Sequence, residues 1–265
     1  MSAGPAGPLY AGIDIGAITA KAALFTLSGE LVTALVAPAG YNRAQAAEEI
    51  LARALLATGL ERTRPARLVA TGYGRVQVPG ADRSVTEITC HARGAHWLCA
   101  QTGTVIDIGG QDSKAIAVGP DGKVLDFVMN DKCAAGTGRF LEVMARALEV
   151  DLDQFGALSV RAPRRAKISS TCTVFAESEV VTHLAAGTPR EQIIAGIHES
   201  IATRLSSMVG RIPLRDTVVL TGGVSQNSGV VQMLAEKLGR PVHVPAQAQA
   251  AGAIGAALFA RDLDR

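Results

Sequence analysis

The stretch Gly12-Ile-Asp-Ile-Gly-Ala-Ile-Thr-Ala-Lys21 returns later in the chain as Val105-Ile-Asp-Ile-Gly-Gly-Gln-Asp-Ser-Lys114. Residues 12–32 and 105–125 align without a gap, and the alignment pairs Asp14 with Asp107, Gly16 with Gly109 and Lys21 with Lys114. Each copy reads as an apolar strand that ends in a carboxylate, a glycine turn, a second strand and a hairpin turn. A repeat of this kind predicts a duplicated α/β architecture, with the boundary between the copies near residue 103.

Helical and strand patterns alternate through the rest of the chain. Apolar residues recur at helical spacing in three stretches, 45–58, 140–150 and 193–208, and small residues form a further predicted helix over 251–260. Buried strands followed by glycine turns are predicted at 68–71, 104–108 and 218–221. We expect a first domain over residues 1–103, joined by the C-terminal helix 251–265, and a second domain over 104–250.

The composition narrows the class of protein. The 265 residues carry 26 basic and 24 acidic side chains, a net charge of +2, which leaves no strongly basic face for nucleic acid. No apolar run approaches the roughly 18 residues that span a bilayer, and the first residues lack the segments of a signal peptide. Four cysteines are too few for a disulfide scaffold in a chain of this length. We expect a cytoplasmic globular protein without a membrane or nucleic-acid partner.

Three predicted strands end in glycine turns, at Asp14-Ile-Gly16, Asp107-Ile-Gly109-Gly110 and Thr221-Gly222-Gly223. Glycine lets backbone N–H groups approach phosphate oxygens without a side chain in the way. The acidic residue ahead of the first two turns can orient Mg²⁺ through its water ligands. The chain has no P-loop, and Gly136-Thr-Gly138 is followed by Leu141 where a Rossmann motif needs a third glycine. The sequence therefore predicts phosphate binding of another design.

Two cysteines lie in polar segments that open predicted helices. Cys133 belongs to Asn130-Asp-Lys-Cys-Ala-Ala-Gly-Thr-Gly-Arg139, and Cys172 belongs to Ser169-Ser-Thr-Cys-Thr173. A thiolate at a helix N-terminus meets the positive end of the helix dipole and free N–H donors. An iron–sulfur cluster normally needs four thiolates, so two cysteines suffice only if a twofold dimer supplies four. The alternative is that each is a small buried residue that fills a core.

Other polar clusters are interpreted as structural. One short stretch holds four potential zinc ligands, Cys90, His91, His96 and Cys99. Their spacing fits no standard zinc site, so helix packing and surface histidines are expected. A basic run follows at Arg161, Arg164, Arg165 and Lys167. A solvated loop is expected there, with contact to a partner or a CoA phosphate as the alternative. Three histidines show no partner in the sequence and are assigned no role, namely His183, His198 and His243.

The glycine turns resemble the motifs of the acetate and sugar kinase, heat-shock chaperone and actin superfamily, whose two ribonuclease-H-like domains clasp ATP between them. In this resemblance residues 12–21 match the first phosphate motif, 105–112 the second and 220–227 the adenosine motif. It spans most of the chain. The fold class that it implies is α/β, with duplicated ribonuclease-H-like domains of the actin-like ATPase type, and the implied ligands are ATP and Mg²⁺.

The implied nucleotide site draws on all three motifs. Its binding residues would be Gly12, Asp14, Gly16, Thr19, Lys21, Asp107, Gly109, Gly110, Gln111, Asp112, Gly136, Thr137, Gly138, Gly222, Gly223 and Asn227. Its catalytic residues would be Asp14, Asp107 and Gln111, and Gln111 is expected to position the attacking water without acting as a strong base. Ala17 and Ile18 stand where members of the family often carry hydroxyls, which leaves Thr19 as the hydroxyl of the first motif.

A closer resemblance, over nearly the whole chain, is to the ATPase family that activates 2-hydroxyacyl-CoA dehydratases and forms the ATPase subunits of benzoyl-CoA reductase. The matching segments are 71–75, 87–93, 107–114, 130–142, 169–179 and 222–227. This resemblance implies a homodimer, or a dimer with a homologous subunit. It also implies that Cys133 and Cys172 of each subunit are the ligands of one shared [4Fe-4S] cluster.

The implied activity is ATP-driven delivery of single low-potential electrons to a CoA-ester-processing partner in anaerobic metabolism. A 2-hydroxyacyl-CoA dehydratase is the favoured partner because the short chain carries no extra domain, and benzoyl-CoA reductase is the alternative. A ferredoxin or flavodoxin would supply the electrons. Two further interpretations are a small-molecule kinase, which predicts phosphoryl transfer without iron, and a nucleotide-switched assembly protein, which predicts filaments.

Overall fold

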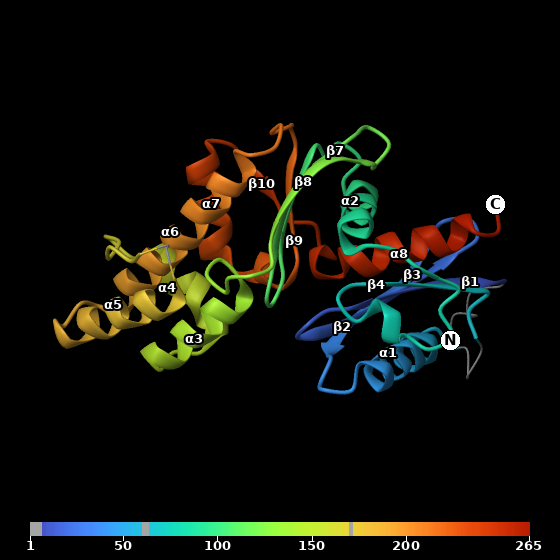
Figure 1. The fold of residues 1–265 in the computed structure, drawn as a ribbon, viewed down its shortest axis with the longest axis horizontal. Helices are drawn as coiled ribbons and strands as arrows, with labels where there is room; N and C mark the ends of the chain where they lie inside the picture. Colours follow the sequence, from blue (N-terminus) through green and yellow to red (C-terminus); the bar gives the residue numbers. More distant parts are fainter. Residues whose placement is uncertain (1–6, 60–63, 170–171) are drawn as a thin grey trace. The chain divides into compact units, whose positions relative to one another are not determined.

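A computed structural model describes residues 7–59, 64–169 and 172–265 of the chain. Within these ranges the structure contains two five-stranded sheets with helices packed against them (Figure 1). The predicted α/β architecture is therefore confirmed. No helix in the described ranges has both the length and the hydropathy needed to cross a membrane.

Contacts between residues divide the chain into two units. Unit 1 comprises the chain up to Thr102 together with Val118–Leu125 and Pro245–Arg265. Unit 2 comprises Gly103–Ala117 and Asp126–Val244. By these contacts residues 118–125 and 245–250 group with unit 1, whereas the sequence repeat places them in the second domain.

The first sheet has the strand order β3-β2-β1-β4-β5. Its strands are β1 (Leu9–Ile15), β2 (Thr19–Thr26), β3 (Leu31–Pro38), β4 (Arg67–Thr71) and β5 (Arg83–Ser84). The antiparallel pairing of β1 with β2 places Lys21 opposite Asp14. The parallel pairing of β1 with β4 places Thr71 beside Asp14.

The second sheet repeats this pattern in the order β10-β9-β6-β7-β8. Its strands are β6 (Thr104–Ile108), β7 (Ser113–Val118), β8 (Val124–Asn130), β9 (Val218–Thr221) and β10 (Val242–His243). β7 places Lys114 opposite Asp107, and the parallel strand β9 places Thr221 beside Asp107. The two copies of the sequence motif thus fold with the same register, and the predicted strands 104–108 and 218–221 are confirmed.

The helices of unit 1 are α1 (Arg43–Ala57), α2 (Glu87–Leu98) and α8 (Ala251–Asp262), with the 3₁₀ turns η1 (Arg75–Gln77) and η4 (Ala248–Ala250). The predicted helix over 45–58 corresponds to α1, which begins two residues earlier because the Asn42 side chain caps it by accepting from the Gln45 N–H. The small residues of α8 permit close packing, as predicted. A Cβ at Gly255 would lie 1.9 Å from the Cys90 carbonyl oxygen on α2.

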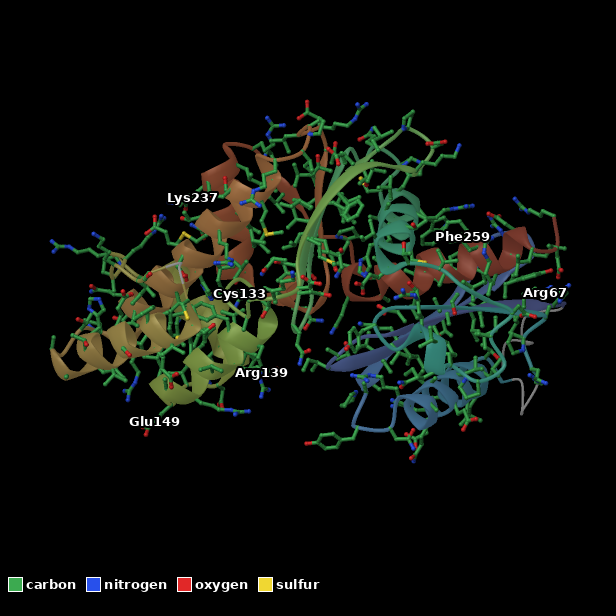
Figure 2. All side chains as sticks on the ribbon, viewed as in Figure 1. Arg67, Cys133, Arg139, Glu149, Lys237 and Phe259 are labelled. Atoms are coloured by element: carbon green, nitrogen blue, oxygen red, sulfur yellow. The ribbon has the colours of Figure 1, made fainter. Side chains whose placement is uncertain are left out.

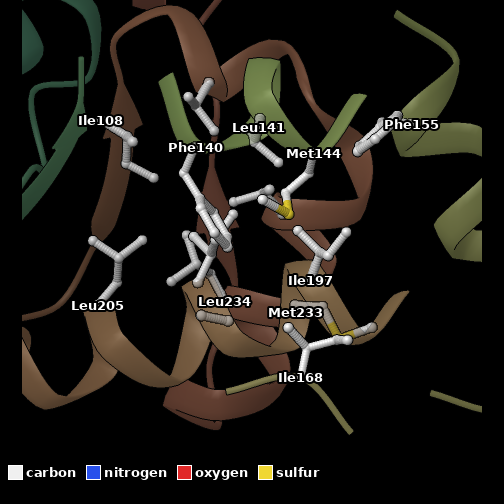
Figure 3. Packing of buried hydrophobic residues seen from close by; sticks show 14 of the residues in the cluster. Ile108, Phe140, Leu141, Met144, Phe155, Ile168, Ile197, Leu205, Met233 and Leu234 are labelled. Carbon is white, nitrogen blue, oxygen red and sulfur yellow. The ribbon is translucent and has the colours of Figure 1, made fainter. Parts of the chain in front are cut away.

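The helices of unit 2 are α3 (Gly138–Leu148), α4 (Phe155–Arg161), α5 (Thr173–Ala185), α6 (Arg190–Val209) and α7 (Ser228–Leu238), with the 3₁₀ turns η2 (Leu152–Gln154) and η3 (Gly223–Gln226). Their apolar faces enclose one core (Figure 3). Phe140 and Met144 on α3, Ile197 on α6 and Leu234 on α7 are all buried in it. Each such side chain stabilises the fold by roughly 1.5–3 kcal/mol. The same core contains Ile108 of β6 and Leu220 of β9, so it packs against the ends of these two strands.

Candidate functional site

In unit 1, the turn after Asp14 is built around a buried ion pair. The Asp14 carboxylate is 3% exposed, and its Oδ2 lies 3.1 Å from the Lys21 Nζ across the β1–β2 hairpin. The Gly16 N–H donates to the Thr19 carbonyl over 3.0 Å and closes the turn between the two strands. Gly72, at φ +84°, follows β4, where a Cβ would lie 2.3 Å from Asp14 Oδ1. Only glycine fits beside this carboxylate.

In unit 2, the equivalent carboxylate, Asp107, is held by two side chains. Its Oδ2 lies 3.2 Å from the Lys114 Nζ, and its Oδ1 accepts from the Thr221 hydroxyl over 2.9 Å. The Gly109 N–H donates to the Asp112 carbonyl over 2.9 Å, which repeats the turn of unit 1. Gly222, at φ +85°, repeats the role of Gly72.

The two turns differ in charge. Lys114 lies 2.9 Å from Asp112 Oδ1 as well as 3.2 Å from Asp107 Oδ2, so two carboxylates share one ammonium group. The Asp112 side chain is 25% exposed, whereas those of Asp107 and Lys114 are nearly fully buried. At the first turn the position equivalent to Asp112 is Thr19, so Asp14 faces Lys21 without a second acid in the turn. Among these carboxylates, Asp112 is the most accessible to a hydrated Mg²⁺, which prefers oxygen ligands.

The turn from Gly222 to Asn227 links β9 to α7. It contains η3, and the Ser225 hydroxyl donates to the Gly222 carbonyl over 2.7 Å. Asn227 ends the turn and caps α7, because its Oδ1 accepts from the Val230 N–H over 3.1 Å. The Asn227 Nδ2 lies 3.2 Å from Nε2 of His198 on α6.

The Cys133 segment is tied directly to the turn after Asp107. The Gly138 N–H donates to the Gly109 carbonyl, and the Arg139 N–H donates to the Gly110 carbonyl, both over 2.9 Å. The segment between β8 and α3 is itself held by a 2.8 Å bond from Asn130 Nδ2 to the Cys133 carbonyl. Figure 2 shows Cys133 in this loop and Arg139 at the start of α3. A displacement of the glycine turn therefore acts on the loop that carries Cys133.

Two hydrogen bonds and a glycine shape the loop between Cys133 and α3. The Thr137 hydroxyl donates to the Ala134 carbonyl over 2.7 Å, and the Thr137 N–H donates to the same oxygen over 3.0 Å. Gly136 takes a φ of +91°, a region that favours glycine. The Gly136 turn lies against the side chain of Arg204 on α6. Gly136 and Thr137 thus shape the loop of Cys133, and the contact of this segment with the glycine turn after Asp107 is made by Gly138 and Arg139.

The two cysteines differ in their position relative to the helix that follows each of them. Cys172 is the N-cap residue of α5, as predicted, and its side chain makes no capping bond. The expectation that Cys133 also lies at a helix start is wrong, because α3 begins five positions later at Gly138. The first N–H groups of α3 are bonded to Gly109 and Gly110. The positive end of the α3 dipole is thus directed at the predicted phosphate turn.

The donor set for a metal cluster is half complete in one chain. Cys133 and Cys172 are free thiols of intermediate exposure, and they precede α3 and α5, two helices that pack against each other. No group of three or more His, Cys, Asp or Glu side chains within the described ranges could hold a metal ion. Two thiols fit half of the four-thiolate set that a [4Fe-4S] cluster requires, so a second subunit would have to supply the other half.

The stretch with four potential zinc ligands contributes to helix packing, as its buried residues show. Cys90 is fully buried in α2, and burial raises the pKa of its thiol to about 12. A thiol with this pKa stays protonated and is a poor metal ligand at neutral pH. His91 is also buried, in contrast to the expectation of surface histidines. A Cβ at Gly252 on α8 would lie 2.8 Å from both His91 Nε2 and Asp14 Oδ2.

The remaining candidates fall on the surface. The Gln111 side chain is exposed next to Asp112. In the basic run, Arg165 pairs with Glu236 over 2.5 Å and with Glu199 over 3.4 Å, which supports a structural role for that arginine. The neighbouring side chains of Arg161 and Arg164 are exposed.

Sequence reasoning named His198 but assigned it no role. Its partner Asn227 lies 29 residues away on another element, and a single histidine in an amphipathic helix carries no spacing signal. The pairing of Gly138 and Arg139 with the glycine turn was missed for the same reason, since it depends on where α3 begins.

Comparisons with known proteins agree on one family. A model described as the BadF/BadG/BcrA/BcrD ATPase family matches residues 11–260. The 2-hydroxyisocaproyl-CoA dehydratase activator of Clostridioides difficile is 44% identical over 251 residues, which cover 95% of this chain and 94% of that protein. A solved structure of that activator from Clostridium difficile, with bound ADPNP, has a TM-score of 0.90 at 43% identity and covers 96% of this chain and 95% of its own. One subunit of the benzoyl-CoA reductase of Thauera aromatica is 34% identical over 261 residues, 95% of this chain and 92% of that protein.

Proposed function

The chain belongs to the BadF/BadG/BcrA/BcrD ATPase family, and we propose that it is an ATPase that activates a CoA-ester-processing enzyme by delivering single electrons to it. A 2-hydroxyacyl-CoA dehydratase is the favoured partner, because the relative at 44% identity is named as the activator of such an enzyme. Benzoyl-CoA reductase is the second candidate, because one of its subunits is 34% identical to this chain.

One observation carries the electron-transfer part of this proposal. Two backbone hydrogen bonds join the glycine turn at Gly109 and Gly110 to the start of α3, directly after the Cys133 segment. A small-molecule kinase of the same fold needs the phosphate turn, but it has no use for a free thiol linked to it. The link supports a protein in which the nucleotide state is transmitted to a thiol site.

In the proposed ATPase, the chain's own residues bind and orient the nucleotide. The Gly16 and Gly109 N–H groups close the turns after Asp14 and Asp107, and the other backbone N–H groups of these turns would bind the phosphates. Lys21 and Lys114 are held at these turns by the carboxylates opposite them. Asp112, the more exposed acid, offers an oxygen to the water shell of Mg²⁺.

The thiols of Cys133 and Cys172, with the same pair from a second subunit, would hold one [4Fe-4S] cluster. Such a cluster supplies one-electron transfer at low potential. The second subunit is a copy of this chain or a homologue, and two exposed apolar side chains at the start of α5, Val174 and Phe175, follow Cys172 by two and three positions. We assign a ferredoxin or flavodoxin as the donor. All four cysteines are free, which suits a reducing compartment such as the cytoplasm.

Gln111 is the residue that we propose to orient the attacking water. Its side chain is exposed beside the second phosphate turn and is a weak base, which predicts slow hydrolysis until a partner docks. Replacing Gln111 by alanine should lower the ATP hydrolysis rate by about 100-fold, the lower range for a positioned catalytic group. The dissociation constant for ATP should stay unchanged. An unchanged rate of phosphate release would remove this role from Gln111.

Anaerobic purification followed by iron and sulfide analysis tests the proposed function. We expect about four irons per dimer, the content of one [4Fe-4S] cluster, with absorbance that oxygen bleaches. The Cys133→Ser and Cys172→Ser variants should each lose the iron. The control variant Cys99→Ser removes a free thiol elsewhere in the chain and should keep the iron. A protein that binds ATP but stays free of iron after reconstitution would contradict the electron-transfer proposal and favour a kinase.

A further inference from the structure

A histidine outside the nucleotide motifs holds the turn that ends at Asn227. We infer that His198 on α6 is a positioning residue for nucleotide binding, because it fixes the Asn227 amide and, through it, the turn from Gly222 to Asn227. This inference rests on the proposed binding of ATP. The start of the same turn is anchored by the 2.9 Å bond from the Thr221 hydroxyl to Asp107. His198 provides the second anchor, at the opposite end of the turn.

The hydrogen bonds fix the orientation of both side chains. The backbone N–H of Val230 can only donate, so the oxygen of the Asn227 amide must face it, at 3.1 Å. The amide nitrogen Nδ2 then faces His198 Nε2 at 3.2 Å. Because Nδ2 can only donate, Nε2 must accept, and the single proton of the neutral imidazole lies on Nδ1. The structure therefore requires one tautomer of His198.

The surroundings of the imidazole keep it neutral and in place. His198 is fully buried, and this burial lowers its pKa to about 3. The ring of Phe155 packs edge-on against it, with centroids 6.0 Å apart. Gly229 on α7 leaves the space for the ring, since a Cβ there would lie 2.4 Å from Nδ1. A second proton on Nε2 would face the Asn227 Nδ2 donor, so the bond to Asn227 also opposes protonation of the ring.

A second polar atom lies on the other side of the ring. Within the described part of the chain, His198 Nδ1 and Ser159 Oγ are both buried without a hydrogen-bond partner. Both residues border Gly229, whose Cβ position would be 2.9 Å from the Ser159 Cβ. The Ser159 hydroxyl oxygen can accept a hydrogen bond, so it is chemically suited to the Nδ1–H of this tautomer. Because a hydroxyl can either accept or donate, this neighbour is compatible with the tautomer that Asn227 requires and does not itself select it.

Long-range ¹H–¹⁵N correlation spectra of the imidazole nitrogens test the tautomer directly. The chain has five histidines, and the signals that disappear in His198→Gln identify the one of interest. We expect a protonated Nδ1 and an unprotonated Nε2 at pH 7, unchanged at pH 5. A proton on Nε2, or a doubly protonated ring at pH 5, would overturn the inference. This readout needs no nucleotide.

Two variants of similar size test the effect on nucleotide affinity. In His198→Gln the side-chain oxygen can take the place of Nε2 and accept from Asn227, whereas in His198→Asn the amide reaches only the place of Nδ1. We expect His198→Gln to bind ADP as the wild type does, and His198→Asn to bind it about tenfold more weakly, the loss of one buried hydrogen bond. Titration calorimetry should be done at a temperature at which both variants are folded by circular dichroism.

The outcomes separate the inference from the proposed function. A wild-type protein that binds neither ADP nor ATP would overturn the ATPase proposal, while the tautomer would still report on the bond to Asn227. Wild-type binding with equal affinities in both variants would overturn the role of His198 alone. If His198→Asn does not fold, the tautomer of the wild type and the ADP affinity of His198→Gln test the inference. A His198→Gln variant with lower ADP affinity than the wild type would contradict it.

Discussion

Replacing Gly138 by proline should weaken ADP binding by at least about tenfold, although Gly138 follows the cysteine loop and lies outside the glycine turns. The Gly138 N–H donates to the Gly109 carbonyl over 2.9 Å, and a proline ring would put a carbon in place of that hydrogen. The turn and the helix must then separate, at the cost of a hydrogen bond worth about 1 kcal/mol and the displacement of Gly109. Calorimetric titration with ADP measures the loss.

The helix itself should tolerate this proline. Gly138 is the first residue of α3, the position at which proline is favoured. Thr137 before it is extended, with φ −125° and ψ 171°, which is the conformation that a following proline requires. An effect of the proline variant would therefore arise at the contact with Gly109 rather than from an unfolded helix.

Gly138→Ala is the matched control, because it adds a Cβ and keeps the N–H. That Cβ would lie 3.3 Å from the Gly109 carbonyl oxygen and 3.5 Å from a Val224 methyl, contacts that small shifts relieve. We expect ADP affinity within about threefold of the wild type, a cost below 1 kcal/mol. Hydrogen exchange over residues 130–139 should slow on ADP binding in the wild type and in Gly138→Ala, but not in Gly138→Pro. Equal behaviour of the two variants would show that this bond does not link the turn to the cysteine loop.

Acidification from pH 7 to pH 5 should lower the free energy of unfolding by about 2 kcal/mol through His198 alone. In the unfolded chain this imidazole takes up a proton near its ordinary pKa of 6.5, whereas in the native state burial lowers the pKa to about 3. Between these two values the unfolded state binds more protons, so stability falls as the pH falls, by about 1.4 kcal/mol per pH unit. Below about pH 3 the loss from this group levels off, because the native imidazole is then protonated too.

The His198→Gln variant isolates this contribution. The four other histidines are the same in both proteins, so the difference between the two pH profiles belongs to position 198. Urea unfolding at pH 7, 6 and 5 should give the wild type a drop in stability about 2 kcal/mol larger than that of the variant. Parallel profiles would mean that the native imidazole accepts a proton in this range and is not held as the neutral ring.

Local sequence was enough to predict the glycine turns after Asp14 and Asp107, because their geometry is made within a few residues. Asp14 and Lys21 face each other across one hairpin, and so do Asp107 and Lys114. The alternation of side chains in a strand fixes which residues meet across a tight turn. The sequence also predicted strands that end at Thr71 and Thr221 and are followed by glycine turns, and the structure shows that each of these glycines leaves room for a carboxylate.

The start of α3 could not be predicted to the residue, and this affected the interpretation of Cys133. The segment Ala134–Gly138 is rich in small residues, and helix ends in such segments depend on what satisfies the free N–H groups. The carbonyls of Gly109 and Gly110 satisfy them here. They lie in another strand turn, so only the packed structure places them at Gly138 and leaves Cys133 in a loop.

The sequence by itself determined the duplicated fold, the three glycine turns and the two cysteines in polar segments. Each of these depends on short-range spacing or on residue chemistry. The tertiary structure alone decided how these parts are joined: His198 to Asn227 across 29 residues, and Gly138 to the turn at Gly109. Such contacts depend on which face one helix presents to another, and that is set by the packing of the whole core.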